Sequence, residues 1–125
     1  MIALDTSSLI AFFAGEPGTD VDLVDRALAD RRACLPPVVL TEMTSDPKLP
    51  KRVAEILEGL PVLELENGYW RRVGKLRAAV LARGMKAYLA DALIAQSCLD
   101  HDVPLVTRDT DFVRFAKVGG LKLVG

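Results

Sequence analysis

The chain is poor in the residues that build thiol or imidazole sites. It has one histidine and two cysteines in 125 residues. Cys34 and Cys98 form no C-x-x-C pair, and His101 stands in a polar stretch typical of a helix end. We therefore expect two buried thiols rather than a disulfide, and a solvated histidine rather than a ligand. The composition argues against a zinc site made of paired cysteine or histidine.

Long apolar runs are also missing. No segment approaches the roughly 20 apolar residues that span a bilayer, and no basic stretch followed by an apolar one opens the chain. We expect a soluble, cytoplasmic protein with no membrane contact. Neither sign of charge is in excess, since 16 basic and 17 acidic residues give a net charge of −1. This balance argues against a basic protein that coats DNA.

Apolar residues, by contrast, are abundant. Half of the residues are hydrophobic, and the mean hydropathy is +0.24. A chain of 125 residues is the size of one domain, so we expect a single domain over 1–125 with a real core. The high mean hydropathy further predicts that part of the surface meets another chain.

Short β-like runs alternate with segments of helical period. The sequence predicts strands at 2–4, 33–35, 61–65, 105–107 and 121–124. It predicts helices at 7–14, 19–32, 36–45, 49–57, 68–83 and 88–99. This alternation indicates an α/β fold, a single three-layer domain in which helices flank both faces of a five-stranded parallel sheet.

Four acidic residues lie where folding alone would not place them. Asp5 follows the first predicted strand, Glu42 and Asp91 interrupt apolar helical segments, and Asp109 follows the strand at 105–107. A buried bare carboxylate costs many kcal/mol, so each must be solvated, paired or metal-bound. Ligands collect beyond the carboxyl ends of parallel strands. The pattern predicts one acidic pocket that binds Mg²⁺ or Mn²⁺ and acts on a phosphodiester.

Each acid also has an ordinary structural interpretation. Asp5 could cap the helix that follows it, Glu42 could be solvated, and only Asp91 has almost entirely apolar neighbours. Asp111 competes with Asp109, because either could cap the short helix after the strand. We favour Asp109 since it is closer to the strand end.

Hydroxyl side chains accompany the two strand ends. Thr6, Ser7 and Ser8 follow Asp5 and could donate to carboxylates or a phosphate, or simply cap the first helix. Thr107 could orient Asp5 or a neighbouring carboxylate, or be an ordinary strand-end threonine. These hydroxyls are therefore candidates for supporting the pocket, not for the chemistry itself.

A basic segment follows the third predicted strand. Arg71, Arg72 and Lys75 share one face of the predicted helix, and this face could track an RNA backbone. The alternative is a solvated face balanced by the acidic first turn of the second predicted helix. For Tyr69 and Trp70 the helical spacing favours packing over stacking on bases.

Together these motifs resemble the PIN-domain nucleases, and among them the VapC-type toxins of bacterial toxin–antitoxin pairs. The resemblance covers nearly the whole chain and rests on Leu4-Asp5-Thr6-Ser7-Ser8-Leu9-Ile10, Leu40-Thr41-Glu42, Leu89-Ala90-Asp91-Ala92-Leu93-Ile94-Ala95 and Leu105-Val106-Thr107-Arg108-Asp109 with Asp111-Phe112. It implies a five-stranded parallel sheet, an Mg²⁺- or Mn²⁺-dependent endoribonuclease, a homodimer, and a small cognate antitoxin whose tail blocks the pocket. Carried over by position, the catalytic set is Asp5, Glu42, Asp91 and Asp109, with Asp5, Asp91 and Asp109 on the metal.

We expect RNA hydrolysis that leaves 5′-phosphate and 3′-hydroxyl ends. The alternative is a catalytically degenerate PIN-like module that binds RNA or a protein without turnover. A haloacid-dehalogenase-like phosphatase needs a second aspartate two residues after the first, where this chain has Ser7. A phosphoacceptor receiver domain needs a differently spaced acidic cluster.

Overall fold

A parallel sheet runs through the centre of the fold, and the computed structural model describes residues 1–125. Its strands are β1 (Ile2–Leu4), β2 (Ala33–Cys34), β3 (Leu105–Val106) and β4 (Leu123–Val124), in the order β2-β1-β3-β4. The helices are α1 (Thr6–Phe13), α2 (Thr19–Ala29), α3 (Pro37–Thr44), α4 (Lys51–Glu58), α5 (Tyr69–Ala82), α6 (Leu89–Asp100), η1 (Thr110–Phe112) and α7 (Val113–Gly119). The alternation of short strands and longer helices predicted this α/β architecture, and the structure confirms it.

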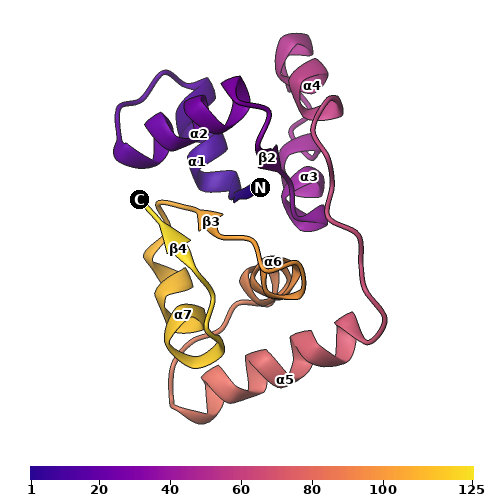
Figure 1. The fold of residues 1–125 in the computed structure, drawn as a ribbon, viewed down its shortest axis with the longest axis vertical. Helices are drawn as coiled ribbons and strands as arrows, with labels where there is room; N and C mark the ends of the chain where they lie inside the picture. Colours follow the sequence, from indigo (N-terminus) through magenta and orange to yellow (C-terminus); the bar gives the residue numbers. More distant parts are fainter.

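The helices cover both sides of the sheet. In Figure 1, α1 and α2 lie on one side of the strands, and α5, α6 and α7 lie on the other. Ala3, Leu4, Leu105 and Val106 have no exposed surface, as strands covered on both faces require. No helix of the structure combines the length and apolar composition that a membrane crossing needs.

The predicted strand at 61–65 is the main difference from the expected sheet. This segment makes only an isolated parallel bridge between Val62 and Leu35, so the sheet has four strands rather than five. Two backbone hydrogen bonds form there, Leu35 N to Pro61 O and Leu63 N to Leu35 O, each 2.9 Å. Val62 and Leu65 remain exposed, so a longer ladder here would bury little apolar surface.

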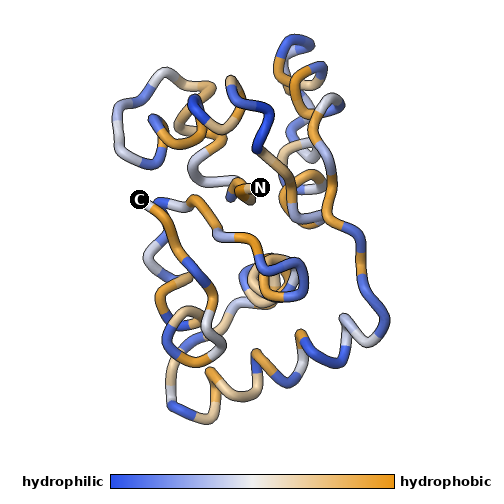
Figure 2. The backbone as a smooth tube through the Cα atoms, viewed as in Figure 1, coloured by the Kyte–Doolittle hydropathy of each residue, from blue (hydrophilic) through white to orange (hydrophobic).

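Helix α5 packs on α6 and α7 through the face that its period predicts. Tyr69 and Val73 are buried on that face, together with Leu76 and Val80. The Tyr69 hydroxyl donates to the Leu93 carbonyl of α6 at 2.6 Å. In Figure 2, hydrophilic and hydrophobic residues alternate along α5, as one buried face requires.

The expectation that Trp70 packs in the core is wrong. Its side chain is 67% exposed. Neighbouring helical residues point about 100° apart, so Tyr69 takes the interior position and turns Trp70 outward. The two rings still meet edge to face, with centroids 5.1 Å apart.

Candidate active site

The topology creates a crevice at the carboxyl ends of β1 and β3. The chain leaves β1 toward β2 on one side and later returns to β3 on the other, which is the switch point where ligands bind in such sheets. Asp5 directly follows β1, and the loop 107–111 follows β3. Asp91 lies in the first turn of α6. Three segments that are distant in sequence therefore bring carboxylates to this edge.

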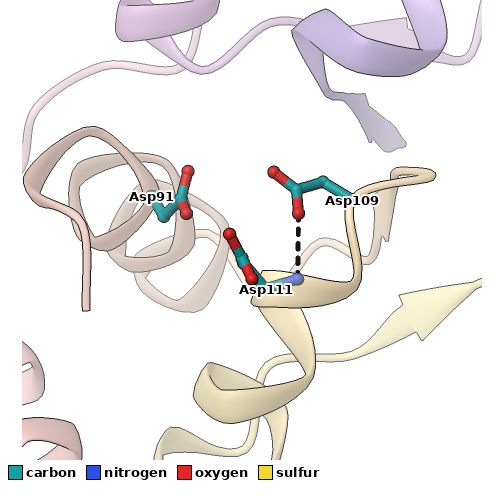
Figure 3. Close-up of side chains that lie close together, drawn as sticks. All are labelled: Asp91, Asp109 and Asp111. Atoms are coloured by element: carbon teal, nitrogen blue, oxygen red, sulfur yellow. Dashed lines mark hydrogen bonds between the residues drawn. The ribbon is translucent and has the colours of Figure 1, made fainter. Parts of the chain in front are cut away.

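Three of these carboxylates form a cluster. Asp91, Asp109 and Asp111 each offer an oxygen, and these atoms all lie within 4.8 Å of one another. Figure 3 shows Asp91 projecting from α6 toward Asp109 and Asp111 on the loop opposite. Opposite oxygens on one octahedral Mg²⁺ lie about 4.2 Å apart, twice the ion-to-oxygen distance. An all-oxygen set at this spacing fits Mg²⁺ or Mn²⁺ after small side-chain rotations.

The negative charge of the cluster is only partly balanced within the protein, by the pairing of Asp111 with Arg114. Burial, and then the charges of Asp109, Asp5, Asp111 and Glu42, raise the pKa of Asp91 from 3.8 to about 7. No basic side chain opposes this shift. A bound divalent cation would relieve the repulsion and restore the charged form of Asp91.

Asp5 is held in place by three hydrogen bonds, and its charge reaches Asp91 of the cluster. It is 4% exposed, and its Oδ2 accepts from Ser7 Oγ at 2.6 Å and from Thr107 Oγ1 at 2.7 Å. The Ser7 backbone N–H also donates to Oδ2, at 3.4 Å, so Asp5 caps α1. All three contacts use the same oxygen, which leaves Oδ1 free of these donors. The capping role and a role in the pocket are thus compatible.

Thr107 connects the two strand ends. While its hydroxyl donates to Asp5, it accepts the backbone N–H of Asp109 at 3.0 Å. Asp109 in turn caps η1, since its Oδ1 accepts the Asp111 N–H at 2.9 Å. Asp111 also pairs with Arg114 at 3.3 Å. The structure brings both Asp109 and Asp111 into the cluster. Their positions therefore do not favour Asp109 over Asp111 as the metal ligand.

Glu42 lies on α3, outside the group of three. Its side chain is exposed, and its Oε1 accepts from Thr6 Oγ1 at 2.8 Å. Its charge nevertheless contributes to the raised pKa of Asp91. The hydrogen bond from Thr6 therefore holds the Glu42 carboxylate near the site.

The basic face of α5 divides into two parts. Arg72 is committed to Asp100 of α6 through two contacts, at 2.8 and 2.7 Å, and also donates to the Asn67 carbonyl at 2.7 Å. Arg71 and Lys75 are exposed and form no ion pair. Only these two remain free for a phosphate backbone. The acidic first turn of α2 does not balance this face.

One feature of the site was not predicted from the sequence. Arg108, between Thr107 and Asp109, pairs with Asp20 at the start of α2. Asp20 is buried and also accepts from Ser8 Oγ at 2.8 Å. An aspartate in a first helical turn has a local explanation in the helix dipole, so nothing in the sequence points to a distant partner.

Several solved structures resemble this chain over almost its full length. VapBC-1 from nontypeable Haemophilus influenzae has 18% identity and a TM-score of 0.74, and the match covers 99% of this chain and 97% of that one. VapBC2 from Rickettsia felis, bound to a DNA fragment from its promoter, has 19% identity, a TM-score of 0.72, and coverage of 99% and 98%. VapBC-5 from Mycobacterium tuberculosis, of the VapBC family of toxin–antitoxin systems, has 20% identity, a TM-score of 0.68, and coverage of 98% and 96%. At these identities the likeness concerns the fold.

A search of curated proteins finds no match to this sequence. A match to a family model, by contrast, shows more than a likeness of fold. Residues 2–118, however, match the model of the PIN domain, and this span contains every acid of the site. The chain therefore belongs to the PIN-domain family.

Proposed function

We propose that this chain is an Mg²⁺- or Mn²⁺-dependent endoribonuclease and the toxin of a toxin–antitoxin pair. The observation that supports the proposal most directly is the cluster of Asp91, Asp109 and Asp111, whose oxygens lie within 4.8 Å. The charges of Asp5 and Glu42 add to the repulsion at Asp91, and a bound cation would relieve it. The family and the VapBC-like fold support RNA as the substrate class and an antitoxin as the kind of partner.

Each residue has a distinct part in this proposal. Asp5, Asp91 and Asp109 hold the cation, with Asp111 available as a further ligand, and Glu42 bounds the space where a phosphodiester would lie. When bound, such a cation polarises the phosphodiester and lowers the pKa of a coordinated water. Thr107 fixes Asp5 and the Asp109 backbone together, so that the ligands need little reorganisation.

The test is cleavage of a synthetic single-stranded RNA with Mg²⁺ or Mn²⁺. We expect products with 5′-phosphate and 3′-hydroxyl ends, and loss of cleavage in excess chelator and in Asp5→Asn and Asp91→Asn. Asp102→Asn is a matched control, because Asp102 is 83% exposed and has a positive φ of 50°, which asparagine tolerates. Cleavage that persists in chelator or in both site variants would contradict the proposal. Cation binding without turnover would favour the degenerate module.

A groove between α2 and α4 suits the antitoxin. It has a volume of about 910 Å³ and is lined by residues of α1, α2 and α4. Small residues on its wall let another chain approach closely, while Ile56 and Leu60 supply apolar contact and Asp25, Arg31 and Glu55 add charge. Growth arrest on expression should be relieved by Asp91→Asn or by co-expression of a cognate antitoxin. Ile56→Glu should weaken that rescue without lowering RNA cleavage.

The face formed by α5 and the start of α6 suits a second copy of the chain. Trp70, Leu81 and Leu89 are exposed there and line one groove of about 360 Å³. A contiguous exposed apolar patch marks an interface more often than scattered residues do. The protruding Trp70 beside a hollow allows a twofold arrangement in which each copy fills the other's groove. Leu89→Asp should convert a dimer into a monomer in sedimentation, and an unchanged mass would refute this face.

A further inference from the structure

The Arg108 side chain is held by a carboxylate outside the acidic cluster, that of Asp20. Its Nε donates to Asp20 Oδ2 at 2.8 Å and its Nη2 donates to Asp20 Oδ1 at 3.1 Å. Further contacts reach the Pro17 carbonyl at 3.3 Å and Glu16 Oε2 at 3.4 Å. Two parallel contacts between a planar guanidinium and a carboxylate fix orientation as well as distance.

Asp20 is itself fixed from the other side. Its side chain is buried, and Ser8 Oγ of α1 donates to Oδ2 at 2.8 Å. The hydrogen bonds from Arg108 are the largest of the effects that hold the pKa of Asp20 at about 2. The carboxylate therefore stays charged at any pH where the protein would work. Arg108 is tied through Asp20 to both α1 and α2.

The backbone around the Arg108–Asp20 pair leaves no room for a side chain. A Cβ on Gly18 would lie 2.5 Å from Asp20 Oδ1 and 3.0 Å from Arg108 Nη2. Both distances are shorter than ordinary van der Waals contact. A glycine is thus required for the pair to close as it does.

The position of Arg108 in the chain gives this pair its significance. Its neighbours are Thr107, which binds Asp5, and Asp109, which belongs to the acidic cluster. The Arg108 backbone N–H also donates to Ser7 Oγ at 3.3 Å. The Arg108 guanidinium therefore anchors the loop 107–111, and the same loop carries Asp109 and Asp111 of the acidic cluster. The charge of Arg108 pairs with that of Asp20 and does not contribute to the raised pKa of Asp91.

We propose that Arg108 is a positioning residue for the cation site. Its pairing with Asp20 sets where the loop 107–111 places Asp109 and Asp111 relative to Asp91 on α6. Loss of the pair lets the loop move, so that the three carboxylates no longer share one ion. This inference rests on the proposed function, because it concerns the same site.

The test is Mn²⁺ affinity of the full chain measured by calorimetry, without RNA. We expect Arg108→Gln and Asp20→Asn to weaken Mn²⁺ binding by about tenfold or more, as loss of groups that orient ligands typically does. Arg108→Lys keeps the charge but loses the planar two-point contact, so it should also weaken binding. The double variant should bind Mn²⁺ no more weakly than either single variant does, because both changes break the same ion pair.

Arg72→Gln is the matched control. The Arg72–Asp100 pair has the same two-point geometry and similar exposed fractions, 39% and 8%, against 35% and 11% for Arg108 and Asp20. It links α5 to α6 and does not touch the loop 107–111. We expect Arg72→Gln and Arg108→Gln to lower the urea midpoint by similar amounts. Only Arg108→Gln should lower Mn²⁺ affinity.

The outcomes separate this inference from the proposed function. A wild-type chain that binds no Mn²⁺ would remove the proposed cation site itself. A wild-type chain that binds Mn²⁺, with Arg108→Lys and Arg108→Gln binding it equally well, would overturn only the role of Arg108. Variants that unfold, or whose remaining folded molecules keep wild-type affinity, would likewise show that the pair is merely structural.

Discussion

Replacing Asp91 by asparagine should stabilise the metal-free protein while abolishing its chemistry. In the fold, burial and the surrounding acids raise the pKa of Asp91 from 3.8 to about 7. Above that pH the folded chain must hold a charge that the unfolded chain holds without penalty. A pKa difference of this size corresponds to roughly 4 kcal/mol, and solvent screening at a partly exposed side chain reduces the expected cost to about 2 kcal/mol.

The dependence on pH follows from the same shift. Below the unfolded pKa of 3.8, Asp91 is protonated in both states and costs nothing. As the pH rises from there to about 7, the unfolded chain ionises first, and stability is lost progressively. Asparagine stays neutral throughout. The gain from Asp91→Asn should therefore be near zero at about pH 4 and reach about 2 kcal/mol at about pH 8.

Urea unfolding of metal-free protein at both pH values measures this gain. Mn²⁺ added at the higher pH should stabilise the wild type, because a ligand that binds only the folded state adds to its stability. The asparagine variant should gain little from Mn²⁺. Asp102→Asn serves as the control at an exposed position. The explanation of the raised Asp91 pKa would be refuted if Asp91→Asn were no more stable than the wild type at high pH. It would also be refuted if the variant gained as much stability from Mn²⁺ as the wild type does.

Three further predictions concern groups around the site. Thr107→Val removes the donor to Asp5 and the acceptor for Asp109, so the Mn²⁺ concentration that half-saturates cleavage should rise, which a metal titration measures. Replacing Arg71 or Lys75 by glutamine should lower the dependence of RNA affinity on salt by about 0.7 in log–log slope each, and an unchanged slope would exclude contact. Tyr69→Phe should cost about 1 kcal/mol in urea unfolding because it loses a buried 2.6 Å hydrogen bond, whereas Trp70→Ala should cost much less in a monomer.

Local periodicity predicted most of the fold because burial repeats with the helix or strand period. The predicted helices at 68–83 and 88–99 differ from α5 and α6 by single residues at their ends. The segment 61–65 alternates like a strand, yet it pairs only at Val62, and Val62 and Leu65 stay exposed. Alternation records which residues suit a sheet, not how many of them find a paired neighbour. That information depends on tertiary structure.

The sequence also indicated the acids of the site, since a carboxylate in an apolar segment or after a strand is conspicuous. Asp5 and Asp91 were recognisable in this way. The pairing of Arg108 with Asp20 was not, because each residue has a sufficient local explanation and 88 positions separate them. Charged pairs that join distant segments leave no periodic signal in a single sequence.

A crystal structure with Mn²⁺, located by its anomalous scattering, would test most directly whether the acidic cluster binds a cation. We predict a strong peak between α6 and the loop 107–111, about 2–2.5 Å from carboxylate oxygens of Asp91 and at least one of Asp109 and Asp111. Asp5 should lie beside it. A fully soaked crystal with no peak there, or with Mn²⁺ bound only elsewhere, would contradict the assignment of this pocket as the metal centre of a nuclease.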